Sequence, residues 1–296
     1  MPDIVIHVVA SALYAGLALH FWRTRWRVQT DRWRVQSERW RTQSSAPGGL
    51  QAWERSAILG ALCLHGWLIW SALSLPEVPR SGFAIALSSM LWIVVLICWI
   101  ENLYVNLEII LPVSLGLAAL CVPLAAWFPG RVPATTSFEF RVHLLLVVLA
   151  YGVLAAAMLY AFLMAVMEHL LHRTRNQGIV QAPGALLAGP FANLPPLLAL
   201  ERRLFTLIGI GFALLTLTLA TGMSLSESLF GRALRFNHET LFAIISWIVF
   251  AVLLAGRHLY GWRGRVATRW VLTGFIMVVL AGIGSRFVLE VVLGRT

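Results

Sequence analysis

Long, uninterrupted apolar runs are the feature of this sequence that most restricts its fold. Crossing the hydrocarbon core of a bilayer takes roughly 20 apolar residues in a helix, and such runs recur along the whole chain. Within lipid, an isolated strand cannot satisfy its backbone hydrogen bonds, so each run is expected to be a helix. The predicted fold class is all-α, a polytopic membrane helix bundle with about eight transmembrane helices. The expected spans are residues 4–22, 57–75, 82–100, 107–128, 142–167, 204–225, 239–258 and 270–292.

The composition leaves little room for anything outside the membrane. Hydrophobic residues make up 59% of the chain and charged residues only 12%, where a soluble domain carries about 25% charge. We therefore expect residues 1–296 to form a single transmembrane domain. The first run is followed by Arg23 and not by a small-residue cleavage site, which predicts a retained helix and not a signal peptide.

Arginine in the loops predicts the orientation of the chain. The net charge is +10, and the basic residues are all Arg. Alternate loops on one side hold sixteen of them and the opposite side holds six, while Arg286 lies in the last span and belongs to neither set. Because basic loops stay in the cytoplasm, both termini are expected outside it. Membrane topology explains this charge, so nucleic acid is not an expected partner. The larger set is Arg23, Arg25, Arg27, Arg32, Arg34, Arg39, Arg41, Arg55, Arg173, Arg175, Arg202, Arg203, Arg257, Arg263, Arg265 and Arg269.

The basic loop 23–55 contains a tandem repeat of seven residues over 26–46, WRVQTDR, WRVQSER and WRTQSSA. This period places Trp26, Trp33 and Trp40 on nearly one helical stripe. Trp favours the bilayer interface and Arg favours anionic headgroups. The repeat is therefore expected either to lie on the membrane surface and bind lipids or to be a duplicated linker without a function of its own.

Four histidines fall at positions that favour a ligand role over an ordinary structural one. His65 lies inside the second span, His143 and His238 open the fifth and seventh spans, and His258 closes the seventh. Imidazole can ligate metal or move protons, and polar groups at membrane depth are costly and often functional. The remaining histidines, His7, His20, His169 and His172, fit ordinary positions near the ends of spans.

Several other kinds of site are absent from the pattern. Cys63, Cys98 and Cys121 lie inside apolar runs with no C-x-x-C, so neither a zinc site nor a redox pair is predicted. No acid–base pair or nucleophile triad stands out, so no catalytic residue is assigned and enzymatic activity is not predicted. No G-x-x-x-x-G-K-[ST] occurs either, which argues against ATP hydrolysis.

The last four spans resemble a known family. The stretches LPPLLALERRLFTLIGIGFALLTLTLATG, NHETLFAIISW and LLAGRHLYGWRGR, and the helix that begins Val142-His143-Leu144, are similar to the cytochrome c assembly family of CcsA-type and HemX-like bacterial inner-membrane proteins. The resemblance extends over residues 57–293. It implies haem handling, with haem b as the expected cofactor and cytochrome c maturation proteins as expected partners. His143 matches the family's first outer haem histidine, and His258 falls close to its transmembrane histidine.

The chain departs from the family at two places. The haem-ligase members, which attach haem, carry a tryptophan-rich W-G-x-x-W-x-W-D stretch, but the equivalent residues 226–237 contain no Trp. Glu239, Thr240 and Trp247 align with the end of that stretch. The family's second outer histidine is replaced near Ser285 and Arg286. The resemblance therefore implies a short, tryptophan-poor relative that binds haem but lacks the residues for attaching it.

Two haem sites at different depths are expected. His238 and His258 lie 20 residues apart on one helix, about 30 Å at 1.5 Å per residue, so one iron cannot bind both. We expect an outer site at His143 with His238 as the partner. An inner site would use His258 with His65, or with His20 in its place.

Two alternatives remain open from the sequence. One is a HemX-like regulatory membrane protein that acts through partners in tetrapyrrole synthesis. The other is a small-solute transporter, although the pair of interrupted spans that often marks transporters is not apparent.

Overall fold

The computed structural model describes residues 2–27, 50–74, 82–104, 110–128, 130, 137–176, 197–231 and 237–292, and all of its regular elements are helices. Most of the 26–46 repeat lies outside these residues. The elements are α1 (Pro2–Phe21), the π-helix η1 (Trp22–Arg27), α3 (Ala52–Ser74), α4 (Phe83–Tyr104), α5 (Ile110–Cys121), α6 (Leu124–Trp127), α7 (Phe138–Asn176), α9 (Leu197–Phe230), α10 (His238–Tyr260), α11 (Gly264–Val279), the π-helix η2 (Leu280–Gly284), α12 (Ser285–Phe287) and the π-helix η3 (Val288–Val292).

Eight stretches of the described chain are long and apolar enough to cross a membrane. This confirms the predicted all-α membrane bundle and the expected number of spans. The last stretch, Gly264–Phe287, combines α11, η2 and α12. The exterior is apolar as well: Trp67 and Trp70 on α3 are 62% and 66% exposed, as expected for side chains that face lipid.

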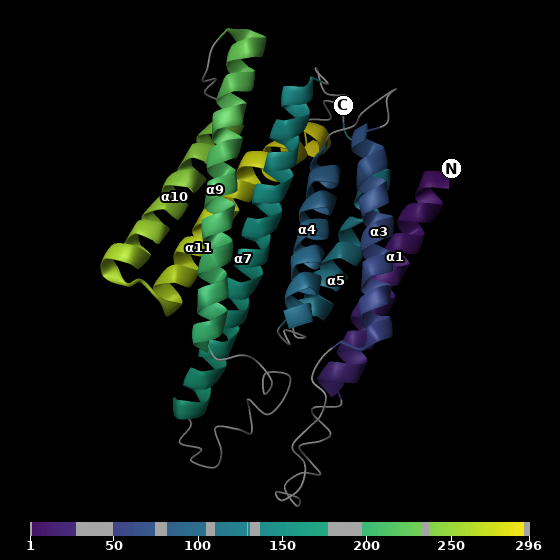
Figure 1. Cartoon of the computed structure of the whole chain (residues 1–296), viewed down its shortest axis with the longest axis vertical. Coiled ribbons are helices and arrows are strands. Elements are labelled where there is room, and N and C mark those ends of the chain that lie inside the picture. The colour runs from purple at the N-terminus through teal and green to yellow at the C-terminus, as the bar shows by residue number, and fades with distance from the viewer. Residues whose placement is uncertain are drawn as a thin grey trace, which may run out of the picture.

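The helices form two neighbouring groups (Figure 1). One group contains α1, α3, α4 and α5, and the other contains α7, α9, α10 and α11. Helices α4 and α7 join the two groups, with Gly152 of α7 against Ile93 of α4. A Cβ at Gly152 would lie 2.4 Å from the Ile93 side chain, so the absence of a side chain permits this close crossing. Small residues have this role at many membrane helix interfaces, where van der Waals packing drives association.

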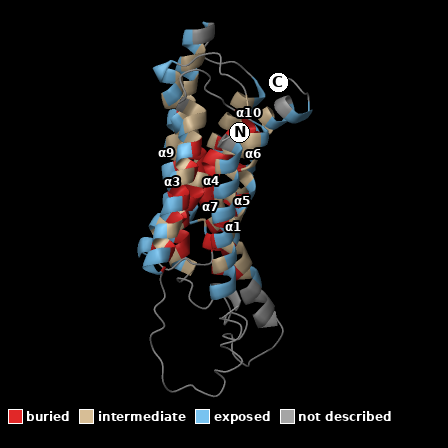
Figure 2. Ribbon diagram, turned by 90° about the vertical axis from the view of Figure 1, so that its right-hand side faces the viewer, coloured by how far each residue is buried: buried red, intermediate tan, exposed pale blue. Residues whose placement is uncertain are grey.

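Buried residues gather along the interior of the bundle, and exposed residues face outward (Figure 2). In Figure 1, α7 begins and α9 ends at the upper end of the bundle, and these two helices run antiparallel to its lower end. The terms upper end and lower end are used in this sense below. The largest buried side chains include Tyr14, Tyr160 and Phe250, which come from both groups of helices.

Helix α9 begins seven residues before the expected span 204–225. The charges of Glu201, Arg202 and Arg203 suggested a loop, but these residues are helical. Glu201 is only 7% exposed, and it pairs with Arg257 of α10 and, at 3.6 Å, with Arg263. A buried carboxylate is tolerated when it is paired and hydrogen-bonded, so the helix can continue through this charged segment.

Candidate functional site

A cavity of about 360 Å³ lies at the upper end of the bundle, between the two groups of helices. Its volume is within the range of small-molecule and cofactor pockets, roughly 300–1,000 Å³. Most of its wall is apolar, and the polar groups come from several helices. The lining residues are Leu73, Gly82, Ile85, Ala86, Ser89, His143, Leu144, Val147, Val148, Tyr151, Thr218, Leu219, Gly222, Met223, Leu225, Ser226, Asn237, Glu239, Thr240, Ala243, Ile244, Ala281, Gly282 and Arg286.

His143 of α7 is the imidazole that lines this cavity. Its Nδ1 lies 3.0 Å from the Thr221 hydroxyl oxygen of α9. That hydroxyl has one proton, which it donates to the backbone carbonyl of Leu217 or Thr218, at 2.9 and 3.1 Å. The hydroxyl must therefore accept from Nδ1–H, which assigns the tautomer in which Nε2 carries the lone pair. A histidine held in this way is prepared to bind a metal through Nε2.

Close helix packing fixes the His143 ring and the opposite wall. A Cβ at Gly222 of α9 would lie 3.1 Å from Cε1 of His143, so this glycine allows the ring to rest against the α9 backbone. A Cβ at Gly282 would lie 2.3 Å from the ring of Tyr151. The π-helix η2 thus packs directly onto a second cavity-lining side chain of α7.

Arg286 enters the cavity wall from α12, immediately after η2. The Ser285 hydroxyl donates to the carbonyl of Leu280 at 2.9 Å, five residues earlier, which is the spacing of a π-turn. Short π-helical segments within longer helices are frequent at functional sites because they change the direction of the following side chains. In this protein the π-helix η2 directly precedes α12, which carries Arg286 into the cavity wall.

The start of α10 supplies the polar edge of the cavity. The Asn237 side chain caps the helix, accepting from the Thr240 backbone N–H at 3.1 Å and from the Thr240 hydroxyl at 2.6 Å. An Asn at the N-cap stabilises a helix by about 1 kcal/mol. Glu239 lies in the first turn, where the helix dipole favours an acidic group. Lower on α10, the Trp247 indole donates to Thr216 at 2.9 Å, which holds α10 against α9.

His238 lies between Asn237 and Glu239, but it is exposed and is not among the cavity-lining residues. The structure therefore does not bring His238 and His143 together in this cavity. Successive residues of a helix are rotated by about 100°, so Asn237, Glu239 and Thr240 can line the cavity while the exposed His238 does not.

His65 lies in the dry core between α1, α3 and α4. It is 1% exposed. Its Nδ1 is 3.2 Å from the Tyr14 hydroxyl, and its Nε2 is 2.8 Å from the Ser88 hydroxyl. Both ring nitrogens are thus engaged by side chains, which is the usual arrangement for a buried polar group.

His258 is exposed at the lower end of α10. Helices α7 and α9 lie between α10 and α3 (Figure 1), so the structure does not bring His258 and His65 together. The neighbouring Arg257 pairs with Glu201 and lies 3.9 Å from the centre of the Phe205 ring. These contacts give the lower end of α10 a structural connection to α9.

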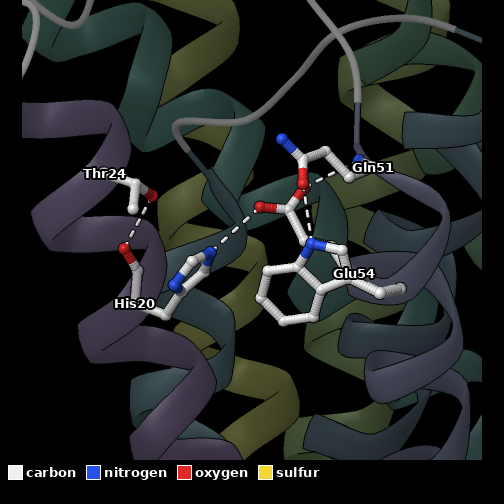
Figure 3. A network of polar contacts seen from close by, with 5 residues as sticks. His20, Thr24, Gln51 and Glu54 are labelled. Carbon is white, nitrogen blue, oxygen red and sulfur yellow. Dashed lines mark hydrogen bonds and ion pairs between the residues drawn. The ribbon is translucent and has the colours of Figure 1, made fainter.

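His20, the other candidate for an inner site, belongs to a polar network between α1 and α3 (Figure 3). Its Nε2 lies 3.0 Å from Oε1 of Glu54, and Oε2 of the same carboxylate accepts from the Gln51 backbone N–H at 2.7 Å. Glu54 is 2% exposed. The network connects the end of α1 to the start of α3, and it lies at the opposite end of the bundle from the cavity.

Among the described residues, no group of three or more His, Cys, Asp or Glu side chains is positioned to hold a metal ion. A haem iron needs fewer ligands from the protein, because the macrocycle supplies four of them and histidine commonly supplies another. A single oriented imidazole in an apolar cavity, as at His143, would be sufficient.

Four residues of this site were not assigned a role from the sequence: Ser89, Gly222 and Arg286, which line the cavity, and Thr221, which contacts His143. Arg286 carried the strongest signal, since an ionisable residue within a span usually has a function. The other three are small residues in apolar helices, and only the crossing of α4, α7 and α9 gives them a common site.

A family model and several known proteins match the part of the chain that contains the cavity. The family model described as cytochrome C assembly protein matches residues 54–293. Inner membrane protein YpjD of Escherichia coli K12 is 30% identical over 263 residues, which cover 83% of this chain and 92% of the relative. Cytochrome c biogenesis protein CcsA of Heterosigma akashiwo is 25% identical over 193 residues, 58% of this chain and 60% of the relative. The same-named protein of Nostoc punctiforme is 32% identical over 85 residues, 29% and 24% respectively. No solved structure matches the chain.

Proposed function

Because this chain belongs to the cytochrome c assembly protein family, we propose that it binds haem b within the membrane and holds it for cytochrome c assembly or haem traffic. Binding and positioning, without a catalytic step of its own, is the proposed activity. The expected partners are haem, membrane lipids and cytochrome c maturation proteins. The proposed location is the bacterial inner membrane, with one transmembrane domain and both termini outside the cytoplasm.

The orientation of His143 is the observation that supports this proposal most directly. In the tautomer assigned above, Nδ1 donates to Thr221 and Nε2 carries the lone pair. Nε2 could therefore bind haem iron while the hydrogen bond between Nδ1 and Thr221 is kept. Hydrogen bonding through the other nitrogen orients such a ligand and raises its basicity.

The apolar walls of the cavity suit the aromatic macrocycle of haem. Apolar side chains from α4, α7 and α10, such as Ile85, Val147 and Ile244, provide a dry surface for an aromatic ring system. Burial of apolar surface contributes about 25 cal/mol per Å². When bound, haem would supply the iron chemistry and the visible absorbance, while the protein residues bind it, orient it and exclude water.

The proposal places one site at the upper end and assigns its imidazole to His143. His238 is exposed outside the cavity, and His65 already has two hydrogen-bond partners. His258 is exposed at the lower end of α10, away from the cavity. These three histidines therefore serve as controls.

The test is a haem b titration of the detergent-solubilised protein, followed by absorbance spectroscopy. The wild-type protein is expected to bind haem and to show a Soret band typical of an imidazole-ligated iron. His143→Ala should weaken binding by at least about tenfold, because removing even the hydrogen-bond partner of a metal ligand has an effect of that size. His238→Ala and His258→Ala should bind as the wild type does. Absence of haem binding by the wild type, or unchanged binding by His143→Ala, would overturn the proposal.

A further inference from the structure

Unlike Arg203, Arg257 and Arg265, Arg286 has no acidic partner among the described residues. Arg203 pairs with Glu101 at 3.5 Å, Arg265 with Glu168 at 3.4 Å, and Arg257 with Glu201. Arg286 forms no ion pair of this kind, although it is partly buried in the wall of an apolar cavity. A charge in such a position is costly unless it is paired, so an anion from outside the chain would stabilise it.

The surroundings of Arg286 favour an anion that occupies the same cavity as the His143 ligand. Its guanidinium is close enough to interact electrostatically with both His143 and Tyr151. All three side chains line the cavity. A molecule bound at His143 would therefore have Arg286 within its own environment and not at a separate surface.

A second observation points to a polar group of a ligand in the cavity. The Ser89 side chain lines the cavity from α4, is 1% exposed and has no hydrogen-bond partner among the described residues. A buried hydroxyl without a partner costs about 1–3 kcal/mol. The cavity thus combines apolar walls with an unpaired cation and an unpaired hydroxyl, which suits an amphipathic molecule.

Glu239 is the acidic group that faces the same cavity. It lies in the first turn of α10, where the helix dipole stabilises its charge, and it forms no ion pair with Arg286. The planar guanidinium group of Arg286 therefore remains available to bind a carboxylate. Glu239 would repel a second carboxylate, so a ligand is expected to direct its acid groups toward Arg286.

We propose that Arg286 is the carboxylate-binding residue of this cavity and that it orients haem by pairing with a propionate while His143 binds the iron. The inference rests on the proposed function for the identity of the ligand. Arginine suits this role because its planar guanidinium binds a carboxylate through two parallel hydrogen bonds. The π-helix η2 and the Tyr151 contact at Gly282 hold the α12 backbone in the position that directs Arg286 to the cavity.

The experiment compares haem b with its dimethyl ester, in which both carboxylates are blocked but the iron and ring are unchanged. Binding is measured by absorbance titration of the purified protein. The unaltered protein is expected to bind haem b on the order of tenfold to a hundredfold more tightly than the diester, as charge-assisted hydrogen bonds contribute that much. Arg286→Gln should abolish this preference and leave diester binding unchanged. Arg286→Lys, which keeps the charge but loses the fork, should give an intermediate preference.

Arg141 provides the matched control, because it is an exposed arginine at the same end of α7 and does not line the cavity. Arg141→Gln should keep the full preference for haem b. His143→Ala should weaken the binding of both haem b and the diester, since it affects the iron and not the carboxylates.

The outcomes separate the two proposals. If the unaltered protein binds neither compound, the proposed function is wrong. If it binds both equally well, haem binding stands and the carboxylate role of Arg286 is wrong, a result that requires no variant to fold. If Arg286→Gln retains the preference for haem b, another group binds the carboxylate and the inference is also overturned.

Discussion

At the scale of single residues, Thr221 determines which nitrogen of His143 is free. Thr221→Val removes the hydroxyl that accepts from Nδ1 at 3.0 Å while keeping a similar side-chain volume. The ring then loses its fixed orientation and tautomer. We expect haem affinity to fall roughly tenfold or more, the usual effect of removing a partner of a metal-binding histidine. Titration by absorbance checks this, and Thr221→Ser should restore binding. Equal affinity of the valine variant and the wild type would contradict the assigned tautomer.

His65 leads to the opposite prediction, an effect on stability without an effect on haem. His65→Leu leaves the hydroxyls of Tyr14 and Ser88 without their partner in the core, at a cost of about 1–3 kcal/mol for each. The melting temperature of the protein in detergent should fall. A second change, Ser88→Ala, should recover part of that loss, because it removes one of the unpaired groups. Loss of haem from the His65 variant at a temperature where it remains folded would show that this histidine is a ligand after all.

At the scale of helices, the buried pair Glu201–Arg257 holds α10 to α9 at the lower end. Glu201→Ala leaves Arg257 without its closest acidic partner. Removing one member of a buried ion pair costs about 3 kcal/mol or more in stability. A loss close to about 3 kcal/mol is expected here, because the Arg257 side chain is 27% exposed. Differential scanning measurements should show the loss. The double variant Glu201→Leu with Arg257→Leu should melt above Glu201→Ala alone, because the charge it leaves without Glu201 is that of Arg263, whose side chain is 65% exposed.

The helices also show what the sequence could and could not predict. Apolar runs of sufficient length predict spans from local composition alone, and eight such spans are present. The bounds of α9 were missed because charge suggested a loop, while Glu201 is in fact paired across two helices. Ser89, Gly222 and Arg286 share a cavity only because α4, α9 and α12 converge on α7. Such convergence depends on tertiary packing and leaves no local pattern in a single sequence.

The same reasoning applies to the histidines. A histidine within an apolar run has the same sequence pattern whether it faces a cavity, as His143 does, or donates and accepts within the core, as His65 does. His238 adjoins three residues that line the cavity but is itself exposed. A shift of one residue along the helix decides whether a side chain lines the cavity or is exposed. The bounds of a helix are rarely predicted from sequence to that precision.

At the scale of the whole molecule, the remaining prediction concerns the direction in which the bundle crosses the membrane. The helix ends that flank residues 28–49 and 177–196 lie at the lower end, and the ends that flank 131–136 lie at the upper end with the cavity (Figure 1). Most of the arginine in the sequence belongs to these lower helix ends or to the segments that they flank, so the lower end should face the cytoplasm. Reporter fusions at Gly49 and Gly184 are expected to give cytoplasmic signals, and a fusion at Pro133 an external one. Neutralising the arginines of 23–41 should weaken this bias, because the loop charge sets the orientation. An external signal at Gly49 would reverse the assignment and would place the His143 cavity on the cytoplasmic side, where haem would be received and not presented.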